Sequence, residues 1–170
     1  MERDQLVNAE ASVLHIAPEA IIQRFLQPRC KWYKTLDLFR DDVDLKEPLE
    51  KTSLADGLLD HIMCSHVLEH VDDRKALQEM FRLLRRGGSL FIMVPIVEGW
   101  DATYEDPSIT TTQARELHFG QGDHVRFYGR DFRTRLREAG FSIEEITANE
   151  PDVTRYGLQR GEKLFVCTKP

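Results

Sequence analysis

Two histidines and a glutamate lie within five consecutive residues near the middle of the chain. His66, Glu69 and His70 have the H-x-x-E-H spacing, which on a helix turns both imidazoles to one face, where they can bind zinc beside a carboxylate base. Here the segment directly continues an apolar run, and the residues able to cap a helix, Asp72 and Asp73, come only after it. The two histidines need not converge, so we expect no metal ligands, and zinc hydrolysis is the weakest alternative.

Polar side chains alternate with other residues in a short segment further along the chain. His124, Arg126 and Tyr128 occupy every second position, so an extended segment would present them on one side. Histidine is the side chain best suited to act as a base near neutral pH. We therefore take His124 as the candidate general base, and Arg126 and Tyr128 as candidate substrate contacts. The alternative is a solvent-facing loop whose polar residues have no such role.

Strand and helix signals alternate over the first hundred residues and return near the C-terminus. Short apolar runs predict strands, and apolar residues that recur at i, i+3, i+4 and i+7 predict helices. The clearest pair is a helix that begins at Asp72 or Asp73 and ends at Gly87-Gly88, followed by a strand over 89–96. Other strands are expected over 12–17, 32–39, 60–65, 141–147 and 163–168, and other helices between 18 and 28 and between 131 and 140.

Two segments lack this periodicity. Residues 37–60 are rich in aspartate and glutamate and are interrupted by Pro48, so we expect a loop with at most one short strand. Residues 97–128 hold several glycines, a proline and scattered apolar residues, which predicts a long irregular insertion. The whole pattern predicts an α/β fold around a mostly parallel sheet.

Length and composition fit one domain over residues 1–170. The chain is 41% hydrophobic and 31% charged, and 23 Lys and Arg against 29 Asp and Glu give a net charge of -6. This balance argues against nucleic acid as a partner. No apolar run has the length of a membrane helix, and the first residues lack an apolar signal core, so we expect a cytoplasmic protein. Three widely spaced cysteines, Cys30, Cys64 and Cys167, are expected to be buried and unpaired.

One block of the chain resembles a known superfamily. Residues 60–71, the helix after them, the Leu-Leu-Arg-Arg-Gly-Gly segment at 83–88 and the apolar strand that follows resemble the class I S-adenosylmethionine-dependent methyltransferases. In that superfamily this order of strand, LEH segment, helix, LkpGG segment and strand carries the fourth and fifth strands. Residues 138–141, Glu-Ala-Gly-Phe, resemble its step into the penultimate strands. The resemblance implies a Rossmann-like methyltransferase fold with helices on both faces and a reduced region for the second helix and third strand.

The loop after the first strand departs from the superfamily. Its usual vLDiGcGtG is replaced at residues 13–21 by Val-Leu-His-Ile-Ala-Pro-Glu-Ala-Ile, so His15 stands where an acid is usual and every glycine is absent. Glycines at this place let the backbone approach the cofactor. The LHIAPE variant, taken together with residues 119–131, resembles a bacterial subgroup of these methyltransferases.

The resemblance also implies which residues bind S-adenosylmethionine. Asp37 ends the second strand, where the superfamily's acid accepts both ribose hydroxyls, and Asp44 is expected to reach the adenine amino group. The alternative for Asp37 is a turn residue, and Glu19 either binds the cofactor's amino group or only caps a helix. The loops that follow the first and fourth strands should face each other. The contacts expected there are Ala17, Pro18 and Glu19 in one loop and Ser65 and His66 in the other.

These features predict transfer of a methyl group from S-adenosylmethionine to an acceptor that the sequence does not identify. Attack on a sulfonium depends on positioning, and a base is needed only where the acceptor must lose a proton. We expect residues 97–128 to be mobile in the free protein and to close over donor and acceptor. The expected acceptor is a small molecule or glycan, with no nucleic-acid or membrane partner and the oligomeric state open. The alternatives are a degenerate member that binds a nucleoside or a partner without catalysis, and the zinc hydrolase.

Overall fold

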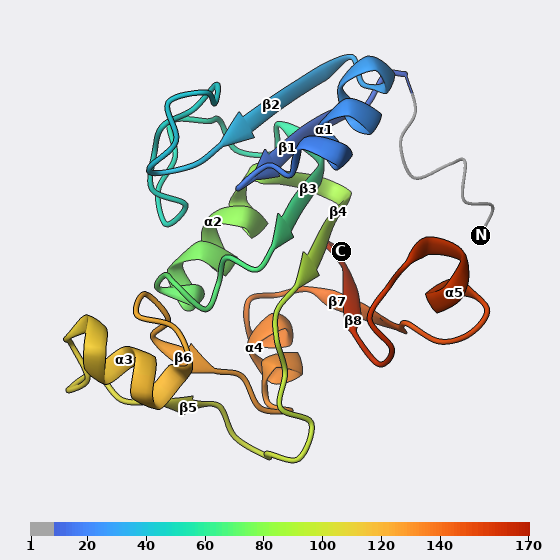
Figure 1. Ribbon diagram of the computed structural model, residues 1–170. Coiled ribbons are helices and arrows are strands. Elements are labelled where there is room, and N and C mark those ends of the chain that lie inside the picture. The colour runs from blue at the N-terminus through green and yellow to red at the C-terminus, as the bar shows by residue number, and fades with distance from the viewer. Residues whose placement is uncertain (1–8) are drawn as a thin grey trace.

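A six-stranded sheet organises the protein, and the computed structural model describes it from residue 9 to residue 170 (Figure 1). The strand order is β2-β1-β3-β4-β8-β7. The first four strands in this order are parallel, β8 is antiparallel to β4, and β7 is antiparallel to β8. The predicted mostly parallel sheet is confirmed. The strands are β1 Ser12–Ile16, β2 Trp32–Leu36, β3 Leu59–Ser65, β4 Leu84–Met93, β7 Ser142–Thr147 and β8 Lys163–Thr168.

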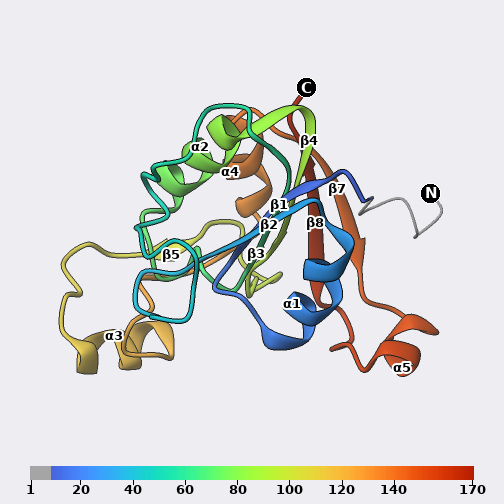
Figure 2. The ribbon, with the colours of Figure 1, turned by 90° about the horizontal axis from the view of Figure 1, so that it is seen from above.

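Helices cover both faces of this sheet (Figure 2). The helices α2 and α4 lie on one face, where Leu14 packs into the large core cluster with Leu77 and Phe132. The helix α1 lies on the other face, where Val13 and Leu26 form a small cluster. Within residues 9–170, none of the helices combines the length and apolar character needed to cross a membrane. The helices are α1 Ala20–Leu26, the 3-10 helix η2 Gln27–Arg29, α2 Asp73–Leu83, α3 Thr112–Phe119, α4 Phe132–Glu138 and α5 Asp152–Tyr156.

The helix α2 ends earlier than the sequence pattern predicted. It begins as expected, because the Asp72 side chain caps it by accepting a hydrogen bond from the Lys75 backbone N–H. It ends at Leu83, and β4 runs straight through Gly87 and Gly88, so the prediction that these glycines stop the helix was wrong. A Cβ on Gly88 would lie 3.1 Å from the carbonyl oxygens of both Leu59 and Asp60. The glycine instead permits a close approach at an irregularity in the pairing of β3 with β4.

The expectation for residues 37–60 is confirmed. Among these described residues the chain forms no helix and only the start of β3; Leu36 and Leu45 make an isolated parallel bridge before it. The region that holds a second helix and third strand in the expected fold is therefore reduced to a loop. The cysteines also agree with the expectation in being unpaired, with Cys64 and Cys167 buried and Cys30 partly buried.

Residues 97–128 are not an irregular insertion. They contain β5 Tyr104–Glu105, α3 and β6 Arg126–Phe127, and β5 pairs with β6 in a small antiparallel sheet. Phe119 and Tyr128 are fully buried, so the view that its apolar residues are too scattered to pack was wrong. Spacing in the sequence could not reveal this, because these aromatic residues pack on distant elements. Closure of this segment over a ligand stays a prediction.

Charged side chains are buried where this segment meets α2 and α4. Asp73 Oδ2 accepts hydrogen bonds from Arg135 Nη1 at 2.8 Å and from the Tyr128 hydroxyl at 3.0 Å. Glu105 in β5 accepts from both Arg126 and Arg135 at 2.9 Å. Asp73, Arg126 and Arg135 are each less than a tenth exposed. Removal of one buried partner leaves the opposite charge without compensation, so these side chains hold the insertion against the helices.

Replacement of Asp73 should therefore destabilise the protein far more than replacement of its neighbour. We expect Asp73→Ala to lower the free energy of unfolding by about 3–5 kcal/mol, because it leaves the positive charge of buried Arg135 without this carboxylate partner. Asp72→Ala removes only an exposed helix cap and should cost about 0.5–2 kcal/mol. Urea denaturation of both variants measures the difference, and equal losses would contradict the assigned role of Asp73.

A second carboxylate links stability to pH. Glu79 in α2 accepts hydrogen bonds from Arg82 and from the Thr52 backbone and hydroxyl, and these lower its pKa from 4.5 to about 2. A lowered pKa in the folded state gives stabilisation that is present above pH 4.5 and lost as the pH falls toward 2. We expect Glu79→Gln to reduce the acid dependence of the free energy of unfolding. Denaturant titrations between about pH 2 and pH 6 test this, and an unchanged slope counts against it.

Candidate functional site

The order in which the chain adds strands to the sheet reverses between β1 and β3. The chain proceeds from β1 to β2 on one side and from β3 to β4 on the other, and Ile16 at the end of β1 pairs with Cys64 in β3. Ligands of open α/β sheets bind at the carboxyl ends of the strands at such a point. The predicted proximity of the loops after these two strands is confirmed, because Ala17 and His66 line the same crevice.

Both loops leave their strands through an unusual backbone conformation. Ala17 has φ 48° and His66 has φ 53°, and among the described residues these are the two non-glycine residues with positive φ. Such conformations cost about 1–3 kcal/mol each and cluster at functional sites. The Ala17 backbone N–H donates to the Leu36 carbonyl at 2.8 Å, and the His66 N–H donates to the Met93 carbonyl at 3.0 Å. The turn that glycine usually supplies is thus made here without glycine.

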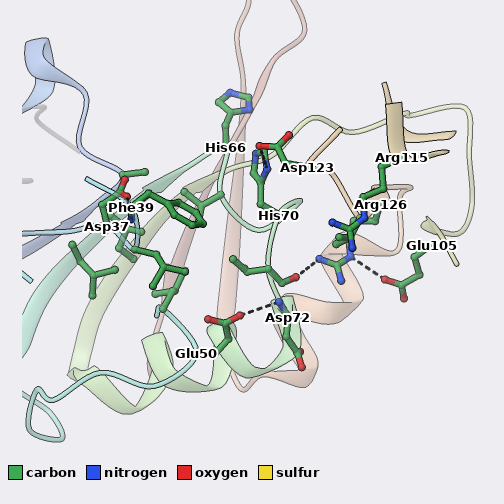
Figure 3. Close-up of a pocket in the computed structure, with 18 of the residues that line it drawn as sticks. Asp37, Phe39, Glu50, His66, His70, Asp72, Glu105, Arg115, Asp123 and Arg126 are labelled. Atoms are coloured by element: carbon green, nitrogen blue, oxygen red, sulfur yellow. Dashed lines mark hydrogen bonds and ion pairs between the residues drawn. The ribbon is translucent and has the colours of Figure 1, made fainter. Parts of the chain in front are cut away.

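The crevice above these loops has a volume of about 810 Å³. Figure 3 shows Asp37 and Phe39 at one end and Arg115 and Arg126 at the other, with His66 between them. Its wall thus comes from β1, β2, the loop after β3 and the inserted segment. Carboxylates predominate among its charged side chains. They are Asp37, Glu47, Glu50, Asp72, Glu105, Asp106 and Asp123.

Asp37 lies where the sequence placed it, at the carboxyl end of β2. Its Oδ1 accepts hydrogen bonds from the backbone N–H groups of Phe39 at 2.8 Å and Arg40 at 3.0 Å. These bonds fix the carboxylate as a turn residue, yet both use one oxygen, which leaves Oδ2 able to accept from a ligand hydroxyl. The alternative role as a turn residue and the predicted role in binding are therefore compatible.

Glu19 is the N-cap residue of α1 and is not among the residues that line the crevice. His15 is 1% exposed and bridges two partners, with Nδ1 2.7 Å from the Tyr33 hydroxyl and Nε2 2.6 Å from Glu19 Oε2. Burial opposes ionisation of Glu19, but its bonds to His15 and Ser65 outweigh burial and lower the pKa of Glu19. His15 therefore positions a carboxylate and does not itself reach the crevice.

Several predicted cofactor contacts do not line the crevice. Asp44 Oδ2 accepts hydrogen bonds from the Thr35 backbone and hydroxyl, both at 2.9 Å, and Asp44 does not line the crevice, so its contact with adenine stays a prediction. Its bonds join the acidic loop to β2. Pro18 contributes its carbonyl oxygen to Arg40 at 2.7 Å. Glu19, Pro18 and Ser65 lie beside the crevice, outside its lining residues.

The candidate substrate contacts in the insertion serve mainly to hold it in place. Tyr128 is fully buried and its hydroxyl bonds the Leu68 carbonyl and Asp73, so the prediction that Tyr128 touches substrate was wrong. Arg126 reaches the wall of the crevice, but its Nη1 donates to the carbonyl oxygens of Leu68 and Val71, each at 2.6 Å. The alternation that suggested a substrate surface arises from packing against the turn after β3.

The H-x-x-E-H segment is a turn and not a helix. α2 begins only at Asp73, so His66 and His70 do not share a helical face and the arrangement of a zinc protease is absent from it. His66 is half exposed, and its contact with Glu69 raises the pKa of His66 above its usual value. His124, the candidate base, is 6% exposed and lies beside His70, with ring centroids 4.6 Å apart.

Other crevice residues had not been predicted from the sequence. Phe39 is 83% exposed beside Asp37, and Arg115 projects from α3 into the opposite end. An aromatic residue two positions after the ribose-binding candidate is a signal that could have been used. No local pattern marks Arg115 or Glu50, because tertiary packing brings them to the crevice, Arg115 from the insertion and Glu50 from the acidic loop between β2 and β3.

Comparison with known proteins agrees with this geometry. The family described as "Methyltransferase domain" matches residues 14–92, just under half of the chain, which run from the middle of β1 through β2, β3 and α2 to nearly the end of β4. This part of the chain is similar to that methyltransferase family. The matched residues contain Ala17, Asp37 and His66. No protein among those of curated function matches the sequence.

Solved structures share the methyltransferase fold over nearly the whole chain. An S-adenosylmethionine-dependent methyltransferase from Mesorhizobium loti is 16% identical with a TM-score of 0.63, covering 98% of this chain and 95% of that one. The Burkholderia thailandensis 1,6-didemethyltoxoflavin-N1-methyltransferase, with bound 1,6-didemethyltoxoflavin and S-adenosylhomocysteine, is 16% identical with a TM-score of 0.63, covering 94% and 70%. The [4+2]-cyclase SpnF is 13% identical with a TM-score of 0.66, covering 96% and 76%. At identities this low, the structural similarity establishes the fold alone, and the reaction must be argued from the site.

The strain at Ala17 gives a direct test of the glycine-free loop. Ala17→Gly should raise the free energy of unfolding by about 0.5–1 kcal/mol, because relief of the left-handed conformation exceeds the added chain entropy of glycine. Ala20→Gly, at the start of α1 with no positive φ, should lower it instead. Thermal and urea unfolding of both variants measure the signs. Destabilisation by both substitutions to the same degree would contradict strain at Ala17.

Proposed function

We propose that the protein transfers a methyl group from S-adenosylmethionine to a small-molecule or glycan acceptor. The observation that carries the proposal is the crevice at the switch point, with Asp37 at one wall and the two strained loops at its base. Its volume of about 810 Å³ lies within the range of roughly 300–1,000 Å³ usual for small-molecule sites. The family match covers the residues that form this part of the site.

The charge of the crevice suits the proposed donor. S-adenosylmethionine carries a sulfonium and an ammonium group against one carboxylate, so it is a net cation. Seven carboxylates line the crevice against two arginines, Arg115 and Arg126, and Arg126 is paired with Glu105. A cleft lined by one sign of charge concentrates ligands of the opposite sign. Electrostatics therefore favour a cationic donor over a nucleoside phosphate.

The ends of the donor have separate partners in this arrangement. Asp37 Oδ2 would accept from the ribose hydroxyls, and the exposed ring of Phe39 offers a surface on which adenine can stack. Glu19, fixed by His15 and Ser65, is the carboxylate of the altered first motif and would bind the ammonium group. The sulfonium would then lie above the loops after β1 and β3.

The reaction needs an acceptor in line with the bond between sulfur and the methyl carbon. The acceptor atom forms a bond to the methyl carbon as the sulfur–carbon bond breaks. The electron pair of the broken bond stays on sulfur, which gives S-adenosylhomocysteine. Holding the two reactants in this geometry supplies most of the rate enhancement. The crevice is bounded on the acceptor side by the insertion, where Arg115 could attract an anionic group of the acceptor.

Asp37→Ala should weaken binding of S-adenosylmethionine and S-adenosylhomocysteine without unfolding the protein. Loss of a charged hydrogen-bond acceptor costs about 1.5–3 kcal/mol, or roughly ten- to a hundredfold in Kd. Calorimetric titration with each ligand gives the Kd, and thermal melting checks the fold.

Asp41→Ala is a matched control in the same acidic loop. Asp41 is 92% exposed and pairs with Lys46, outside the crevice, so its loss should leave both Kd values unchanged. Unaltered affinity in folded Asp37→Ala would show that Asp37 only shapes the turn. A wild-type protein that binds neither ligand would overturn the proposed function itself.

A further inference from the structure

A second cavity, of about 500 Å³, adjoins the donor crevice and shares two of its wall residues, His66 and His70. It lies between the turn after β3 and the turn after α3. Glu69, Gln121 and His124 complete its polar lining, and apolar residues of the insertion form much of the rest. The proposed donor chemistry uses neither Glu69, His70 nor His124.

These three side chains converge on one another. Glu69, His70 and His124 each offer one ligand atom, and the three atoms all lie within 4.8 Å of each other. Glu69 is 2% and His124 is 6% exposed, while His70 is partly buried. In a tetrahedral zinc site with bonds of 2.0–2.1 Å, ligand atoms are about 3.4 Å apart. A closure of at most about 1.4 Å, within reach of side-chain rotation, would bring them to that geometry.

One carboxylate oxygen of this cluster is buried and has no hydrogen-bond partner among the described residues. This atom is Glu69 Oε2, while Oε1 lies 3.5 Å from His66 Nδ1. A buried polar atom without a partner costs about 1–3 kcal/mol, and more when it is charged. Such atoms are rare in folded proteins and call for an explanation. A cation between Glu69 and the two histidines supplies one.

The two imidazoles are oriented by groups on their outer sides. His124 Nδ1 lies 3.2 Å from the Phe119 carbonyl oxygen, which can only accept, so this nitrogen carries the proton. His70 Nδ1 lies 3.2 Å from Asp123 Oδ2, and Figure 3 shows the two side chains next to each other. With both Nδ1 atoms as donors, the Nε2 lone pairs are free to bind a metal. Carbonyl and carboxylate partners of this kind hold metal-binding histidines in known sites.

We propose that Glu69, His70 and His124 bind one divalent transition-metal ion of the zinc type. Two imidazoles and a carboxylate suit such ions, and three protein ligands leave a position open for an exogenous oxygen. The ligands differ from the H-x-x-E-H pair, since His124 from the insertion takes the place of His66. As a metal ligand through Nε2, His124 would not act as the general base that its sequence position suggested.

Because the site lies beside the donor crevice, an ion bound there could activate the acceptor for methyl transfer. This step rests on the proposed methyl transfer, whereas metal binding does not. An acceptor hydroxyl bound to the ion would lose its proton to water more readily, because the metal lowers its pKa. Its oxygen would then bond to the methyl carbon as the sulfur–carbon bond breaks. The inference predicts an acceptor that presents a hydroxyl group.

Metal binding is tested on the full chain after chelator treatment, in the absence of S-adenosylmethionine. Calorimetric titration with Zn²⁺ should give one ion per chain, and Co²⁺ should give visible absorption bands of a site with nitrogen and oxygen ligands. Glu69→Gln and His124→Ala should each weaken Zn²⁺ binding by tenfold or more. His118 is an exposed histidine of α3 outside the cavity, so the His118→Ala variant should bind Zn²⁺ as the wild type does.

Asp123→Ala keeps the test decisive if a buried variant fails to fold. Asp123 is 73% exposed and touches the proposed ion only through His70, so its loss should spare the fold and weaken Zn²⁺ about 10- to 100-fold. Absence of stoichiometric binding by the wild type, or equal affinity in all folded variants, would overturn the site. Zinc binding in a protein that does not bind S-adenosylmethionine would support the site and overturn the proposed function.

Discussion

The structure depends on the buried carboxylate of Asp73. It stands at the first turn of α2, where a negative charge meets the positive end of the helix dipole, and accepts from Arg135 and Tyr128. Through these contacts the end of the insertion and α4 are fixed against the helix that follows β3. The far wall of the crevice is thereby set relative to the strand ends. A protein that lacked this buried charge would keep its sheet but lose the relation between the two walls.

The sheet could be predicted from the sequence because its signals are local. The apolar runs that became β1, β3 and β8 need only their own residues to be recognised, and the expected and observed bounds agree within one residue. The resemblance of residues 60–96 then placed the loops after the first and fourth strands of the expected fold next to each other. Gly87 and Gly88 misled because glycine ends helices and also admits close strand contacts, and the nearby Asp60 carbonyl decides between these roles.

The site could be predicted only where it lies at strand ends. Ala17, Asp37 and His66 line the crevice because the topology fixes the ends of β1, β2 and β3. Tyr128 was misassigned, and the bonds of Asp44 to Thr35 were not foreseen, because these contacts join parts of the chain with no common sequence pattern. The cluster of Glu69, His70 and His124 was missed for the same reason. Its members had been noticed separately, but only the packing of the insertion brings His124 across to the other two.

The small sheet of β5 and β6 has a consequence for how such a protein can diverge. Its two strands pair with each other and not with the central sheet, and Arg126 and Glu105 carry much of its attachment. Substitutions in the stretch between these strands, which includes α3, therefore have no route by which to shift the register of the donor-binding strands. Selection can alter the acceptor wall while the donor wall is conserved. In the proposed function, the residues that would bind the cofactor and those that would bind the acceptor thus belong to separate parts of the fold and can change independently.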